Sequence, residues 1–124
     1  MANHDIRLAI KRIYEAPEPT DGIRVLVDRL WARGVSKEAA DLGAWMKELG
    51  PTDELRTWFG HDPERFDEFA RRYRAELRQP AQAAAVEHLR EVAQMRPVIL
   101  LTATKRVDIS QAAVLADVLR EPAQ

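Results

Sequence analysis

Four consecutive apolar residues, Val98-Ile99-Leu100-Leu101, constrain the fold of this chain more than any other stretch. A strand with one face in water alternates apolar and polar residues, whereas an uninterrupted apolar run is typical of a parallel strand covered on both faces. Residues 25–27, Val-Leu-Val, form a second run of this kind. Parallel strands need crossover connections, which are usually helices. We therefore expect an α/β fold with the strand at 98–101 in the middle of its sheet.

Periodicity and capping residues predict the other elements. Residues 6–13 alternate apolar and polar side chains, as a strand with one buried face does. Ser36 is placed to begin a short helical turn, and Asp108 with Gln111 is expected to cap the last helix. Residues 42–49 fit either a strand or a helix, and we favour a strand because a glycine lies near their start. Longer helices are predicted at residues 53–59, 63–78 and 81–95.

The length and composition predict one domain over residues 1–124. Apolar residues make up 46% and charged residues 31%, an ordinary mixture for a globular protein. With strands and helices in alternation, we expect a single small α/β domain. Its mostly parallel central sheet of about four strands is flanked by helices in a Rossmann-like three-layer arrangement. Because no long apolar run and no charged leader occur, we expect a cytoplasmic protein with no membrane contact.

The residue types present disfavour several function classes. There is no cysteine, which excludes disulfides, thiolate nucleophiles and cysteine-bound metals. The histidines His4, His61 and His88 show no metal-ligand spacing, so we expect no metal and no cofactor. His4 and His88 are expected at the surface. With 19 basic and 20 acidic residues there is no overall field for a polyanion. Nucleic acid therefore remains only an alternative partner, and no oligomeric state is predicted.

Charged and aromatic side chains follow the two apolar strands directly. In open α/β sheets, ligands bind outside the carboxyl ends of the strands. The loop after residues 25–27 carries Asp28, Arg29, Trp31 and Arg33, and the loop at 102–106 carries hydroxyl and basic groups. If the two strands are parallel neighbours, these groups converge into a site for a small anionic ligand. In the alternative interpretation, Asp28 pairs with an internal arginine and Trp31 only covers the sheet.

Three further residues are candidates for a role in such a site. His61 lies beside Asp62 and could carry a proton near neutral pH, although Asp62 is also a plausible helix cap. Lys47 faces either the cleft or solvent. If the protein is an enzyme, Asp28 would orient the ligand and His61 would act as the acid or base.

A series of motifs over nearly the whole chain resembles one family. It includes Ile10-Lys11-Arg12-Ile13-Tyr14, Val25-Leu26-Val27-Asp28-Arg29-Leu30-Trp31-Ala32-Arg33-Gly34, Trp45-Met46-Lys47-Glu48-Leu49 and Trp58-Phe59-Gly60-His61-Asp62. This series is similar to the DUF488 family, in its YeaO-like branch. The resemblance implies a small bacterial α/β protein with no established activity. It adds a set of candidate ligand-binding residues: Lys11, Arg12, Arg24, Asp28, Arg29, Trp31, Arg33, Lys47, His61 and Asp62.

The chain departs from the family pattern after its last strand. YeaO-like members typically carry Tyr-Ala-Ala-Lys-Asp there and then His-Asn, whereas residues 102–106 are Thr-Ala-Thr-Lys-Arg and residues 109–110 are Ile-Ser. The broader family often has Cys-His-Arg in this region. The departure implies a changed or lost activity in this copy.

Two functional hypotheses follow. The first is a basic, anion-binding cleft, with an enzyme on a phosphorylated or carboxylated small molecule as its catalytic form. The second is a regulatory or interaction module that binds protein or nucleic acid and catalyses nothing. Whether the protein is an enzyme stays open at this point.

Overall fold

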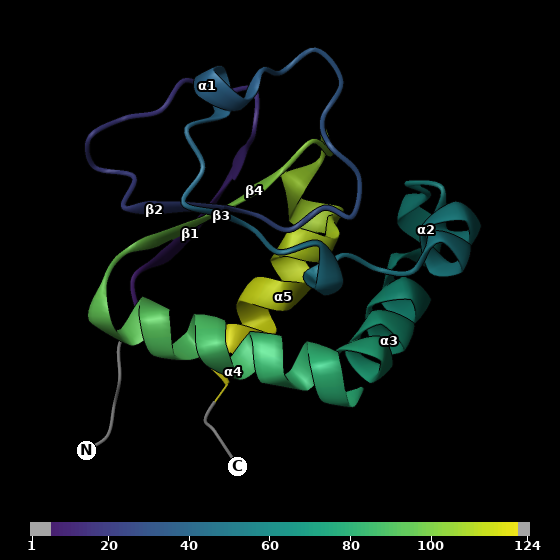
Figure 1. Cartoon of the computed structure of the whole chain (residues 1–124). Helices are drawn as coiled ribbons and strands as arrows, with labels where there is room; N and C mark the ends of the chain where they lie inside the picture. Colours follow the sequence, from purple (N-terminus) through teal and green to yellow (C-terminus); the bar gives the residue numbers. More distant parts are fainter. Residues whose placement is uncertain (1–5, 122–124) are drawn as a thin grey trace.

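The computed structural model describes residues 6–121 and has an α/β fold (Figure 1). His4, which was expected at the surface, and Pro122, which was expected to end the last helix, lie outside these residues. The strands are β1 (Leu8–Arg12), β2 (Ile23–Leu26), β3 (Ala44–Trp45) and β4 (Val98–Thr102). The α-helices are α1 (Lys37–Ala40), α2 (Asp53–Phe59), α3 (Phe66–Leu77), α4 (Pro80–Met95) and α5 (Gln111–Arg120). Short 3-10 turns are η1 (Lys47–Leu49), η2 (Pro63–Arg65) and η3 (Val107–Ile109).

The four strands form one parallel sheet in the order β1-β4-β2-β3. The prediction that the apolar run at 98–101 lies inside the sheet is confirmed, because β4 pairs with β1 on one side and with β2 on the other. Leu101 lies between Lys11 of β1 and Leu26 of β2. The carboxyl ends of β2 and β4 are therefore neighbours, as the strand-end prediction required.

The two faces of the sheet are covered unequally. Val98 and Leu100 point into the larger core under α2 to α5, whereas Ile99 and Leu101 belong to a second, smaller core. That second core is closed by α1 and by the loop after β2 (Figure 1). The predicted three-layer arrangement is thus present, with one thick helical layer and one thin layer made mostly of loop.

A stack of aromatic rings in the larger core fixes α2 against α3. Phe69 lies between Phe59, at 4.3 Å from ring centroid to ring centroid, and Tyr73, at 5.6 Å. Phe69 and Tyr73 are four residues apart on α3, so they share one face of the helix. The buried Tyr73 hydroxyl donates to the carbonyl of Leu49 in η1. This stack holds the end of α2, and the turn after it, beside the sheet.

The helix boundaries confirm most of the predicted caps. Ser36 accepts from the backbone N–H of Ala39 at 3.0 Å, as predicted, and Thr52 caps α2 by accepting from that of Leu55 at 3.2 Å. Asp62 also caps as predicted, although the first turn after it is the 3-10 turn η2 rather than an α-helix. These side chains satisfy N–H groups that lack partners within the helix.

Two predictions from the sequence were wrong in detail. Ser110 caps α5, because its side chain accepts from the backbone N–H of Ala113, while Asp108 pairs with Arg106 at 2.8 Å. Residues 42–49 contain only the two-residue strand β3, followed by the turn η1. Within residues 6–121, no helix combines the length and the apolar character needed to span a membrane.

Candidate functional site

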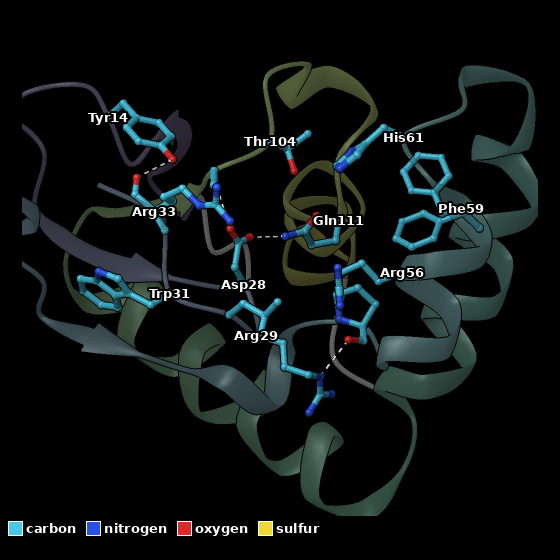
Figure 2. A pocket seen from close by; sticks show the side chains of 15 residues that line it. Tyr14, Asp28, Arg29, Trp31, Arg33, Arg56, Phe59, His61, Thr104 and Gln111 are labelled. Carbon is cyan, nitrogen blue, oxygen red and sulfur yellow. Dashed lines mark hydrogen bonds between the residues drawn. The ribbon is translucent and has the colours of Figure 1, made fainter. Parts of the chain in front are cut away.

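A cavity of about 300 Å³ opens at the carboxyl ends of β2 and β4 (Figure 2). The loop after β2 forms one wall, α2 and the turn after it form the opposite wall, and the start of α5 lies between them (Figure 2). The lining residues that carry polar or charged groups are Tyr14, Asp28, Arg29, Trp31, Arg33, Arg56, His61, Thr104 and Gln111. Apolar residues complete it: Leu30, Ala32, Pro51, Phe59, Phe69 and Ala103.

Asp28 is the acidic residue of the cavity, and its carboxylate is held by three donors. One oxygen accepts from the Thr102 hydroxyl at 2.7 Å and from the Gln111 side-chain amide, and the other accepts from the backbone N–H of Ala103 at 2.8 Å. These bonds join the end of β2 to the end of β4 and to the first residue of α5. Asp28 therefore fixes the loops around the cavity.

No basic side chain of residues 6–121 lies within 4.0 Å of the Asp28 carboxylate, so its predicted internal arginine partner is absent. Burial raises the pKa of Asp28, although the three hydrogen bonds oppose the shift. Trp31 does cover the sheet as the alternative interpretation expected. Its ring packs against Trp45 at 5.1 Å between centroids, and its indole N–H donates to the carbonyl of Val35 at 2.7 Å.

The two arginines of the loop after β2 have different surroundings. Arg29 donates from its guanidinium to the carbonyls of Gly50 and Pro51, both at 2.9 Å, and so ties the loop to the segment before α2. Arg33 is exposed, and among the described residues its guanidinium has no hydrogen bond or ion pair. Its backbone carbonyl accepts from the Tyr14 hydroxyl at 3.1 Å. Arg33 therefore has a charged group available at the cavity.

The opposite wall contributes an imidazole and a guanidinium. His61 follows Gly60, and both have left-handed backbone conformations with φ of 58° and 55°. Such a conformation costs about 1–2 kcal/mol for a residue with a side chain. The turn brings His61 to the cavity, while Arg56 lies lower on the same wall and is 3.3 Å from Asp53 on its own helix (Figure 2).

The structure brings half of the predicted ligand-binding residues to the cavity: Asp28, Arg29, Trp31, Arg33 and His61. The others lie elsewhere. Lys47 lies over the Trp45 ring at 4.5 Å, Asp62 caps η2, and Arg12 donates to the carbonyl of Ala103 at 3.2 Å.

Lys11 and Arg24, the remaining two predicted residues, hold a buried carboxylate. Asp21 is 2.5 Å from the Lys11 ammonium and 2.8 Å from the Arg24 guanidinium. The hydrogen bond from Lys11 is the main reason that the pKa of Asp21 falls to about 2. Arg24 also donates to the carbonyl of Ala40 at 2.9 Å, which fastens α1 over the smaller core.

Tyr14, Arg56 and Gln111 line the cavity but were not among the predicted site residues. Gln111 had a signal in the sequence, since a residue that opens the helix after a central strand belongs to the strand-end region. Tyr14 and Arg56 had none, because only the packing of α2 and of the loop after β1 brings them there. Of the predicted loop residues, Thr104 lines the cavity, and Arg106 instead pairs with Asp108.

The donor set of the cavity suits an anion better than a metal cation. Three arginines, one aspartate and one histidine line it. Within residues 6–121, no group of three histidine, cysteine, aspartate or glutamate side chains is arranged to hold a metal. The arrangement can attract a small negative ligand and donate hydrogen bonds to it.

The chain is similar to bacterial proteins that are named as uncharacterized. It is 46% identical to the uncharacterized protein Rv3073c of Mycobacterium tuberculosis over 115 residues, which are 93% of this chain and 95% of the relative. It is 39% identical to the uncharacterized protein YeaO of Escherichia coli, over 93% of this chain and 98% of that protein. No solved structure matches the chain at a significant level. The model of the family described as "Inactive DUF488-N3 subclade" matches residues 7–124, so the chain belongs to the DUF488 family and to this subclade.

Proposed function

We propose that this protein binds a small anion in the cavity at the ends of β2 and β4 and does not transform it. The observation that carries the proposal is the Arg33 guanidinium, which lies at the cavity with no hydrogen bond or ion pair to a described residue. A permanent positive charge beside a concave site favours an anionic ligand, and each charge-assisted hydrogen bond contributes about 1.5–3 kcal/mol.

The other charges of the cavity support an anion. Arg29 and Arg56 add two positive charges against the single negative charge of Asp28. The first residue of α5 lies at the cavity, where the positive end of the helix dipole adds to the attraction. His61 contributes a further positive charge when it is protonated.

The surroundings of Asp28 favour binding without catalysis. Both oxygens of its carboxylate accept hydrogen bonds from the protein, so Asp28 serves as a structural anchor rather than as an attacking group or a base. The description of the matching subclade as inactive supports the same reading, as does the altered loop after β4. Of the two candidate catalytic residues that line the cavity, Asp28 and His61, only His61 then remains.

Isothermal titration calorimetry with inorganic phosphate and sulfate tests the proposal. We expect weak but saturable binding that falls with rising salt concentration and falls about tenfold or more in Arg33→Ala, which removes one charge-assisted contact. Arg71→Ala is the matched control, because Arg71 is exposed on α3 and does not line the cavity. Equal affinities of the two variants would contradict the proposal.

A further inference from the structure

We infer that the ligand of this cavity carries an aromatic or other apolar ring next to its anionic group. The inference rests on the proposed anion site and names the class of molecule that the site selects. It depends on where the exposed apolar side chains of the protein lie.

Large apolar side chains that face water are rare on this protein, and they gather at the cavity. Among residues 6–121, three such side chains are exposed: Tyr14 at 46%, Leu30 at 55% and Met95 at 80%. Two of the three, Tyr14 and Leu30, line the same cavity. Apolar side chains that gather around a concave site mark a surface that a ligand or partner covers.

The Tyr14 ring is held in place beside the anion-binding group. Its hydroxyl donates to the backbone carbonyl of Arg33 at 3.1 Å, and the Arg12 guanidinium lies 4.7 Å from its ring centroid. Tyr14 and Arg33 thus form one wall of the cavity, with the ring tied to the backbone of Arg33 (Figure 2).

The wall opposite Tyr14 carries Arg56 and His61, and apolar residues complete the lining of the cavity. Phe59, Phe69 and Pro51 also line the cavity, but all three are buried, so Tyr14 and Leu30 are the exposed large apolar side chains there. An inorganic anion would fill only the charged part of a cavity of about 300 Å³ and would leave Tyr14 and Leu30 in water. Removing apolar surface from water is favourable in proportion to its area, so a ring attached to the anion adds affinity that the anion alone does not have.

Phosphate monoesters and carboxylates share the required chemistry, and the experiment separates them. Calorimetry would compare phenyl phosphate with inorganic phosphate, and benzoate with acetate. We expect the aromatic member of at least one pair to bind about tenfold more tightly than its partner without a ring, which corresponds to burial of about 55 Å² of apolar surface. The pair that shows the difference identifies the anionic group.

Substitution of Leu30 tests the apolar wall separately from the charge. Leu30 is exposed, so Leu30→Ala leaves the fold intact. We expect it to weaken binding of the aromatic anion about threefold to fivefold and to leave inorganic phosphate unchanged. Met95→Ala is the matched control, since Met95 is exposed on α4 and does not line the cavity.

The outcomes separate this inference from the proposed function. Equal affinities for phenyl phosphate and inorganic phosphate, and for benzoate and acetate, would overturn the inference that the ligand carries a ring. The proposed anion site would not be affected by that result. An equal effect of Leu30→Ala and Met95→Ala on the aromatic anion would overturn the role of Leu30. If none of the four anions binds at low salt, the anion site and the inference that rests on it both fail.

Discussion

Asp21→Asn is expected to destabilise the protein more than any exposed charge substitution. The Asp21 side chain is 3% exposed and lies between Lys11 and Arg24, whose own side chain is also 3% exposed. Removing one partner of a buried ion pair costs about 3–5 kcal/mol, because the remaining charge stays buried without its partner. We expect the free energy of unfolding to fall by about 3 kcal/mol at pH 7 in urea denaturation.

The pH dependence of this effect follows from the depressed pKa of Asp21. Its pKa of about 2 in the folded protein lies below the ordinary value of 3.8, so the carboxylate contributes stability above about pH 4. That contribution is about 2 kcal/mol, and it is lost as the pH falls through the folded-state pKa. The difference between the wild type and Asp21→Asn should therefore shrink by about 1 kcal/mol between pH 6 and pH 3.

Glu18→Gln provides the matched control for Asp21→Asn. Glu18 lies 3.1 Å from the same Lys11 ammonium, but its side chain is 63% exposed. An exposed ion pair contributes about 0–1 kcal/mol, so Glu18→Gln should change stability little. Equal losses in the two variants, or a loss in Asp21→Asn that is the same at pH 6 and pH 3, would refute the role assigned to the buried carboxylate.

Three further substitutions test other parts of the structure by chemical denaturation. Asp28→Ala leaves three donors without their acceptor and should cost about 2–4 kcal/mol; no loss would show that the carboxylate does not anchor the loops. Gly22→Ala should cost more than Gly34→Ala, since both have positive φ but only a Cβ at Gly22 would meet the carbonyl oxygen of Pro97, at 2.3 Å; equal costs would contradict this packing. Tyr73→Phe removes a buried hydroxyl that donates to a backbone carbonyl and should cost about 1–2 kcal/mol, whereas an unchanged midpoint would argue against that bond.

The sheet could be predicted because a strand that is buried on both faces has no polar residues in its sequence. Residues 98–101 have no polar interruption, and the structure shows why, since both faces of β4 are covered. The strand-end rule then located the cavity beside Asp28, because parallel neighbouring strands bring their carboxyl ends together. These two steps needed only local patterns and the direction of the strands.

The rest of the candidate site depends on contacts that no local pattern encodes. Lys11 and Arg24 look like candidates for an anion site, yet their partner is Asp21, which the sequence shows only as part of a turn. Tyr14 reaches the cavity through a hydrogen bond to a residue 19 positions away. The cap of α5 was misplaced because Gln111, which resembles part of a capping pair with Asp108, instead donates to Asp28.

The thin layer over the second face of the sheet gives the loop after β2 two roles at once. Trp31 and Ala32 seal the smaller core, while Arg33 and Leu30 on the same loop face the cavity. Because so short a segment serves both, a ligand that fixes Arg33 also restrains the residues that close this core. Occupancy of the cavity should then slow amide hydrogen exchange in β3, which lies under Trp31 at the edge of the sheet. The loop would thereby report on the cavity through the local opening of a strand that does not line it.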